Sequence, residues 1–219
     1  CAGGTTGIEP ATEEDANDDG IPDGCNGPDL VVDTGHIRDT LEVDYIFVEP
    51  GDCYIEERCV SGSGLRKVLR FATKVGNAGN DDLRLGQPGD ENWTYNMCHE
   101  HYHFPDYAFY ELYTEGGHQI TTVGYKNGWC VMDLTQHEGS ERACRTYNCQ
   151  NQGISAGCAD IYSAALDCQW VDITHIADGT YTLRVTTNPD LNLYELNYDN
   201  NSADVAIEIN GDVIIPLTP

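Results

Sequence analysis

Five segments of the chain partly alternate apolar and polar residues with the period of two that is typical of β-strands. They are rich in Val, Ile, Tyr, Thr and Leu, and Gly, Asn and Pro lie between them. The segments are residues 41–50, 65–75, 107–113, 179–189 and 202–210. No long stretch has the 3.6-residue period of an amphipathic helix, although short helical turns are expected in 155–167. This pattern predicts a mainly β fold, an antiparallel β-sandwich with long loops.

Residues 1–27 have a different pattern, rich in Gly, Asp and Asn and poor in periodic apolar residues. The stretch "DANDDGIPDGC" has the ligand spacing of a calcium loop, with Gly at the sixth position. The predicted ligands are Asp15, Asn17, Asp19, Ile21 through its backbone carbonyl, and Asp23. Position 12 is Asn26 and not the bidentate Glu of an EF-hand, and the stretch instead resembles the calcium-binding repeats of thrombospondin type 3 modules. The alternative is an acidic linker that binds no ion.

The chain is strongly acidic, with a formal net charge of −26 from 37 acidic and 11 basic residues. This argues against nucleic acid as a partner, because phosphate binding requires basic patches. An acidic surface attracts polycations and cationic amines, but acidity also keeps a secreted protein soluble, and composition does not separate these roles.

Ten cysteines at wide spacings predict five disulfides and an oxidising compartment. We therefore expect a secreted protein with disulfide-stapled loops, whose signal peptide was removed before residue 1. No apolar run is long enough to cross a bilayer, so no membrane insertion is expected.

The most distinctive chemistry lies in "CHEHYH", which places His99, His101 and His103 at strict alternation. In a strand they would share one face, but at about 3.3 Å per residue His99 and His103 would be about 13 Å apart. They can bind one ion only if the segment curls or bulges. Imidazole suits zinc, copper, iron or nickel, and three His with an open position also suit a hydrolytic zinc site. An adventitious cluster remains the alternative.

Several motifs resemble, in the same order, those of the lysyl oxidase family. They are "MCHEHYHFPDYAFYELY", "VGYKNGWC", "QGISAGCADIYSAALDCQWVDIT" and "YELNYDNN", and the resemblance covers roughly residues 29–209. It implies a lysyl oxidase-like catalytic domain at 28–219, after the calcium-binding module at 1–27. By position, it also implies that His99, His101 and His103 bind copper.

The resemblance further implies that Lys126 and Tyr162 form a lysine tyrosylquinone. In isolation Lys126 would be an ordinary surface lysine and Tyr162 a core aromatic. Asp160 is the first candidate for the general base and Asp106 the second, although both also suit ordinary turn or solvated carboxylates. Animal family members carry another His where this chain has Phe109, so any proton-transfer role of that His is absent or moved.

The resemblance also selects a disulfide pairing, in which Cys98 is bridged and does not bind the metal. The pairs that it implies are Cys53–Cys59, Cys98–Cys149, Cys130–Cys144 and Cys158–Cys168, which leaves Cys1–Cys25. The expected partners are a primary amine or lysine-containing protein and molecular oxygen. A non-catalytic extracellular module that keeps the metals as structural ions is the main alternative, and a zinc hydrolase is another.

Overall fold

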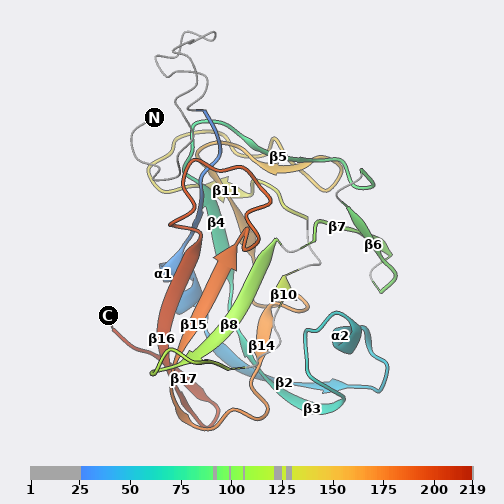
Figure 1. Ribbon diagram of the computed structural model, residues 1–219, viewed down its shortest axis with the longest axis vertical. Helices are drawn as coiled ribbons and strands as arrows, with labels where there is room; N and C mark the ends of the chain where they lie inside the picture. Colours follow the sequence, from blue (N-terminus) through green and yellow to red (C-terminus); the bar gives the residue numbers. More distant parts are fainter. Residues whose placement is uncertain are drawn as a thin grey trace.

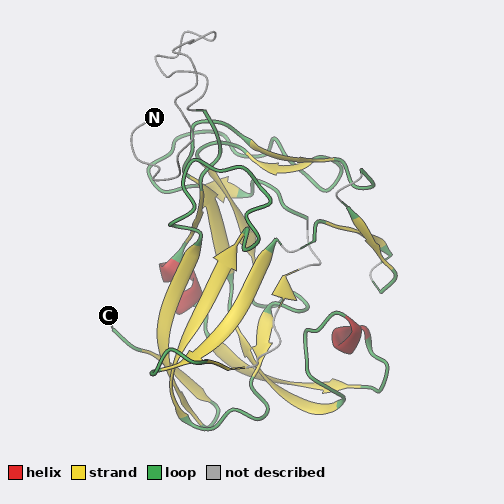
Figure 2. Ribbon diagram, viewed as in Figure 1, coloured by secondary structure: helices red, strands yellow, loops and turns green. Residues whose placement is uncertain are grey.

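The computed structural model describes residues 26–90, 93–98, 100–105, 107–120, 125–126 and 130–218, with His101, Tyr125 and Lys126 described by their backbone only. Within these ranges the helices are two short ones, α1 (Thr34–Arg38) and α2 (Cys53–Glu56), and strands form the rest of the regular structure (Figure 2). The Asp33 and Asp52 side chains cap these helices by accepting backbone N–H bonds.

All strand pairs in the described ranges are antiparallel, which confirms the predicted mainly β, antiparallel class. The largest sheet has the order β10 (Tyr125–Lys126), β8 (Ala108–Thr114), β15 (Gly179–Thr187), β16 (Ser202–Asn210) and β17 (Val213–Pro216), with β9 (Gln119–Ile120) also on β8 (Figure 1). A second sheet has the order β1 (Leu30–Val32), β4 (Thr73–Asn77), β13 (Cys158–Tyr162) and β11 (Thr135–Gln136).

Three smaller sheets complete the fold. Their strands are β14 (Trp170–Asp172), β3 (Gly64–Arg70) and β2 (Glu42–Val48); β12 (Gln152–Ile154) and β5 (Leu83–Gly86); and β6 (Thr94–Asn96) and β7 (His101–His103).

One hydrophobic core joins the two larger sheets. In the six-stranded sheet, Leu112, Leu183 and Val205 lie side by side across β8, β15 and β16 and are almost fully buried. Val75 of β4 and Tyr162 of β13 belong to the same buried cluster. The burial of one face of each strand explains the alternating pattern in the sequence.

Two element boundaries differ from the sequence prediction. The segment 65–75 forms two strands, β3 and β4, in different sheets, with buried Phe71 and Ala72 where the chain crosses. No helix forms in 155–167, where Cys158–Tyr162 is a strand between β4 and β11. The Ala- and Ser-rich composition of this segment favoured turns over a strand, and the pairing on both edges overrode that preference.

The expected disulfide pairing is wrong for all eight described cysteines. The bridges are Cys53–Cys98, Cys59–Cys168, Cys130–Cys149 and Cys144–Cys158, with Cα–Cα distances of 5.1 to 5.7 Å. Bridging requires cysteines to meet in space, and segments far apart in the sequence meet here, such as α2 and the segment after β6. Tyr162 is therefore not enclosed by a Cys158–Cys168 loop. Cys1 and Cys25 lie outside the described residues.

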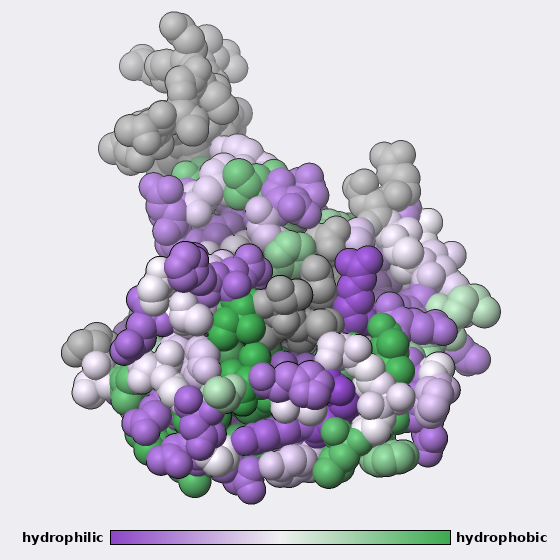
Figure 3. All heavy atoms as spheres, turned by 60° about the horizontal axis from the view of Figure 1, so that its bottom comes forward, coloured by the Kyte–Doolittle hydropathy of each residue, from purple (hydrophilic) through white to green (hydrophobic). Residues whose placement is uncertain are grey.

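Hydrophilic residues predominate on the face drawn in Figure 3, as expected from the net charge of −26. Among the described residues, no helix has the length and apolar character needed to span a bilayer.

Candidate functional site

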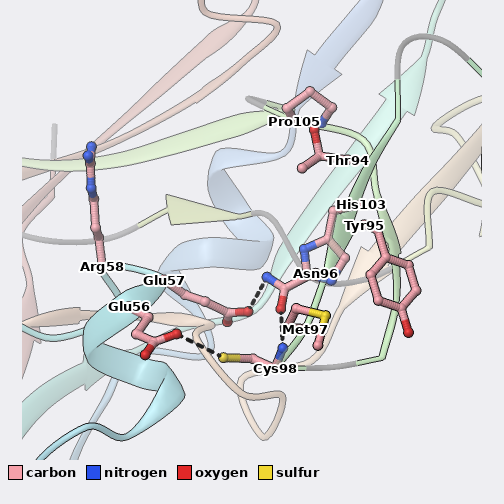
Figure 4. A pocket seen from close by; sticks show the side chains of 10 residues that line it. All are labelled: Glu56, Glu57, Arg58, Thr94, Tyr95, Asn96, Met97, Cys98, His103 and Pro105. Atoms are coloured by element: carbon pink, nitrogen blue, oxygen red, sulfur yellow. Dashed lines mark hydrogen bonds between the residues drawn. The ribbon is translucent and has the colours of Figure 1, made fainter.

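A cleft of about 400 Å³ opens beside α2 and the β6–β7 hairpin (Figure 4). It is lined by Glu56, Glu57, Arg58, Thr94, Tyr95, Asn96, Met97, Cys98, His103 and Pro105. Figure 4 shows Glu57, Asn96 and His103 around the same space, with the Arg58 side chain turned away from them. The cleft therefore combines carboxylates, an amide and an imidazole.

Covalent and polar contacts fix the walls of this cleft relative to each other. The Cys53–Cys98 disulfide joins the start of α2 to the segment that follows β6. Asn96 links the same two parts, because its Nδ2 donates to Glu57 Oε1 at 2.5 Å and its Oδ1 accepts from the Cys98 N–H at 2.7 Å. The residues just before the histidine segment are thus anchored to α2.

The structure places one of the predicted metal ligands in the cleft wall. His103 lines the cleft and is only 6% exposed, and it pairs across the hairpin with Thr94. His101 occupies the same strand two positions earlier, where its backbone pairs with Asn96. His99 lies outside the described residues.

The backbone bends immediately before β7. Glu100 has a φ of 54°, in the left-handed region that non-glycine residues seldom adopt. A flat strand would separate the first and third histidines too far for both to bind one ion. The turn at Glu100 interrupts the strand just before the second histidine. The bend and the buried imidazole fit a metal site formed by this segment.

Another group of potential ligands does not suit a metal. Glu57, Cys59 and Cys168 have ligand atoms within 4.8 Å of one another, but the two cysteines form a disulfide. Metals bind the thiolate, which a disulfide does not offer. Cys98 is likewise bridged, as expected, although its partner is Cys53.

Tyr162 lies in a buried polar cluster at the end of β13. It is 2% exposed, and its hydroxyl donates to the Cys130 carbonyl at 3.2 Å. Burial raises the pKa of Tyr162 well above its ordinary value, and the nearby Asp160 carboxylate, with Tyr107 and Tyr110, raises it further. The phenol is therefore protonated at neutral pH.

Asp160 shares the strand face of Tyr162, two positions earlier, and is completely buried. Its carboxylate also raises the pKa of the buried Tyr107 hydroxyl, after the larger effect of burial. Asp160 is therefore inside the tyrosine cluster and not a solvated turn carboxylate. The second candidate base, Asp106, lies outside the described residues.

The backbone of Lys126 approaches this cluster from the neighbouring sheet. In β10 it pairs with Ala108 of β8, next to Tyr107. Cys130, which accepts the Tyr162 hydrogen bond, lies only four positions further along the chain. The backbone of the segment that carries Lys126 therefore lies next to the tyrosine cluster.

Two disulfides hold these segments together. Cys130 is bridged to Cys149, and Cys158, at the start of the Tyr162 strand, is bridged to Cys144. Both bridges end in the same short segment, 144–149, so the segment after Lys126 and the strand of Tyr162 are fastened to one loop. This arrangement takes the place of the expected disulfide loop around Tyr162.

Comparison with known proteins supports the resemblance seen in the sequence. The lysyl oxidase family model matches residues 28–217. The chain belongs to the lysyl oxidase family. It is 34% identical to a protein-lysine 6-oxidase of Gallus gallus over 196 residues, which are 84% of this chain and 46% of that protein.

Two longer relatives show a similar likeness. The chain is 32% identical to lysyl oxidase homolog 4 of Homo sapiens over 85% of its length, and 33% identical to lysyl oxidase homolog 3A of Danio rerio over 80%. These matches cover 26% and 24% of the two relatives. The chain therefore spans less than half the length of these lysyl oxidase relatives.

Sequence reasoning missed several residues that line the cleft. Glu56 and Glu57 reach the cleft because the Cys53–Cys98 bridge brings α2 beside the histidine hairpin, and no spacing in the sequence signals this. Asn96 was also missed, although its place two residues before Cys98 could have suggested a turn contact. Tyr162 is not among the residues that line the cleft. The predicted calcium ligands, Asp15 to Asp23, lie outside the described residues.

Proposed function

We propose that this chain is a secreted, copper-dependent amine oxidase of lysyl oxidase type. It would convert a primary amine, with peptidyl lysine as one candidate, to an aldehyde. The balanced reaction consumes one molecule each of amine, oxygen and water and releases aldehyde, ammonia and hydrogen peroxide. Membership of the lysyl oxidase family over residues 28–217 is the observation that carries this proposal.

The proposed copper ligands are His99, His101 and His103. The burial of His103 in the cleft wall and the left-handed backbone at Glu100 support this assignment. Three imidazoles suit copper(II), which binds most tightly among the divalent first-row ions. When bound, copper together with oxygen would supply the oxidising power that converts a tyrosine ring to a quinone.

Lys126 and Tyr162 are the proposed precursors of the lysine tyrosylquinone. The uncharged amine of Lys126 would add through Nζ to a ring carbon of the oxidised Tyr162. That carbon and the nitrogen would each lose a hydrogen, and oxygen would accept the two electrons and become hydrogen peroxide. Two contacts support the approach of Lys126 to Tyr162. The Tyr162 hydroxyl donates to the carbonyl of Cys130, four residues after Lys126, and the backbone of Lys126 pairs with Ala108, next to Tyr107. Cofactor assembly is thus proposed for the buried Tyr162 and for a lysine whose backbone pairs with Ala108, next to Tyr107.

Asp160 is the proposed general base. Its buried carboxylate lies in the Tyr162 cluster, where it can accept the proton that the substrate loses from the carbon next to its nitrogen. The protein would therefore supply orientation and proton transfer, while the quinone performs the difficult redox step.

The acidic segment 1–27 is proposed to be a separate calcium-binding module that precedes a catalytic domain at 28–219. Asp15, Asn17, Asp19 and Asp23 would supply carboxylate and amide oxygens, and Ile21 a carbonyl. We propose this module as structural, because its calcium would order the loop without entering the amine chemistry.

A carbonyl reagent tests the proposed activity directly. Copper-loaded, aerated protein should form a coloured adduct with phenylhydrazine and should release peroxide only when an amine is added. A zinc hydrolase or a non-catalytic metal-binding module contains no quinone and would form no such adduct. Metal-replete protein that neither forms the adduct nor releases peroxide would overturn the proposal in favour of the non-catalytic module.

A further inference from the structure

Asp133 is a buried carboxylate that the proposed amine chemistry does not use. It is 1% exposed and lies just before β11. Its Oδ1 accepts the Tyr147 N–H at 2.7 Å, and its Oδ2 accepts the Arg145 and Thr146 N–H groups, both at 3.2 Å. The Ser155 hydroxyl donates to the same Oδ2 at 2.8 Å. One carboxylate thus holds three consecutive backbone N–H groups and a hydroxyl.

These contacts keep Asp133 charged. Burial raises the pKa of its carboxyl, but the hydrogen bonds from the Tyr147 N–H, the Ser155 hydroxyl and the Thr146 N–H bring it below its ordinary value. A charged acceptor forms stronger hydrogen bonds than a neutral one. An amide could not replace this carboxylate, because its nitrogen donates and would face at least one backbone N–H that also donates. Asp133→Asn therefore breaks the arrangement with almost no change in side-chain size.

The loop that Asp133 holds is also the anchor of two disulfides. Cys144 and Cys149 flank the three N–H groups, and they are bridged to Cys158 and Cys130 respectively. Cys158 begins β13, and Cys130 precedes Asp133 by three positions. The carboxylate therefore fixes this loop to the two segments that contact the buried tyrosine cluster.

The backbone on both sides of Asp133 is fixed close to Tyr162. The Cys130 carbonyl accepts the Tyr162 hydroxyl at 3.2 Å. The next residue, Val131, donates its N–H to Gln152 Oε1 at 2.7 Å. β11 begins two positions after Asp133 and pairs with β13, the strand of the tyrosine. The placement of the Cys130 carbonyl, and with it the orientation of the phenol, therefore depends on the anchoring of this short segment.

We propose that Asp133 is a positioning residue for cofactor assembly. By holding the loop and the segment that begins at Cys130, it keeps the Tyr162 ring in the orientation in which the Lys126 amine adds to it. Cys130 follows Lys126 by four residues, so their Cα atoms lie at most about 14 Å apart, and the same anchor limits where the lysine can lie. This inference rests on the proposed oxidase function, and it uses the addition and the two-electron oxidation by oxygen described above without a further step.

Nitration of metal-free protein with tetranitromethane tests this positioning without any turnover. Tyr162 and Tyr110 are each 2% exposed, so both should react slowly in the wild type. Asp133→Asn should raise the nitration rate of Tyr162 by roughly 5- to 10-fold, the change in local opening expected from about one lost hydrogen bond. The rate of Tyr110, whose hydroxyl donates to Gln169, should stay the same. Global destabilisation would instead expose both tyrosines.

Two control variants should leave both nitration rates unchanged. Asp172→Asn is the matched change, because Asp172 is also a buried carboxylate with several hydrogen-bond donors, but it lies in β14 of another sheet. Tyr147→Phe retains the backbone N–H that Asp133 accepts. If Asp133→Asn does not fold, Ser155→Ala replaces it, since this change removes only the hydroxyl donor and should show the same selectivity to a smaller extent.

The second measurement is the rate of cross-linking in copper-loaded, aerated protein, followed by peptide mass spectrometry. Asp133→Asn should slow the conversion of oxidised Tyr162 to the Lys126 cross-link by roughly 10-fold, because the step depends on the placement of the ring, while copper content stays the same. A normal cross-linking rate, or nitration that is unchanged or equally raised at Tyr162 and Tyr110, would overturn the proposal. If the wild type forms no quinone, the oxidase function fails, but selective nitration of Tyr162 would still support its positioning by Asp133.

Discussion

Replacing Tyr162 by Phe separates the proposed catalytic role of this residue from its structural role. The change removes the hydroxyl that donates to the Cys130 carbonyl at 3.2 Å and interacts with the Asp160 carboxylate. The hydroxyl has one proton, so it makes one full donated bond, which contributes about 1 kcal/mol to a neutral acceptor and about 1.5–3 kcal/mol to a charged one; we therefore expect a loss of about 1–3 kcal/mol. A domain of this size would then unfold about 2–12 °C lower.

The fold should survive this loss, because four disulfides and the core of two packed sheets remain. Turnover, in contrast, should vanish, since Phe has no oxygen from which a quinone can form. The assays are thermal unfolding, copper content by elemental analysis, and amine-dependent peroxide release. Tyr147→Phe is the control, because it removes a buried hydroxyl that donates to the Asp82 carboxylate at 3.1 Å, away from the cluster.

The control should lose comparable stability and keep its turnover. Sustained turnover by Tyr162→Phe would refute the reasoning. An equal loss of turnover in both variants would show that destabilisation alone explains the effect.

Three further predictions test other parts of the account. His101→Ala should lose most of its copper, because two imidazoles bind far less tightly than three, while the exposed control His118→Ala keeps it; full copper occupancy by elemental analysis in the first variant would contradict the assignment. Chelating calcium should speed proteolysis near Gly20 without lowering copper content, and equal cleavage with and without chelator would exclude the calcium loop. Burial alone would raise the Asp172 pKa, but hydrogen bonds from Thr174, the Ser61 N–H and Arg66 lower it to about 2. This carboxylate should therefore contribute about 2 kcal/mol of stability above pH ~4, which is lost as the pH falls towards 2. The free energy of unfolding of Asp172→Asn, measured with urea, should lack that pH dependence. If it falls between about pH 4 and pH 2 as steeply in the variant as in the wild type, this prediction is contradicted.

The sequence predicts the regular strands well because burial of one face imposes a visible period. β8, β15 and β16 follow the predicted segments closely, and their inward residues form the rows of the core. The strand Cys158–Tyr162 was missed because it pairs on both edges and is buried on both faces, so that no alternation marks it.

The candidate site is only partly readable from the sequence. The alternating histidines of residues 99–103 are visible as a pattern in the sequence, whereas Lys126 and Tyr162 are assigned through the resemblance of their segments to those of lysyl oxidases. The disulfide partners and the carboxylates that line the cleft depend on which distant segments meet, such as α2 and the hairpin joined by Cys53 and Cys98. The left-handed turn at Glu100 is also invisible in composition, because Glu seldom adopts it.

The central claim is that Lys126 and Tyr162 become one cofactor. Peptide mass spectrometry of copper-loaded, aerated protein tests it most directly, after reduction of the disulfides and digestion. The account predicts a single cross-linked species that contains the peptides of both residues, and its absence from protein kept without copper. Unmodified, separate Lys126 and Tyr162 peptides from protein that oxidises amines at full rate would contradict it.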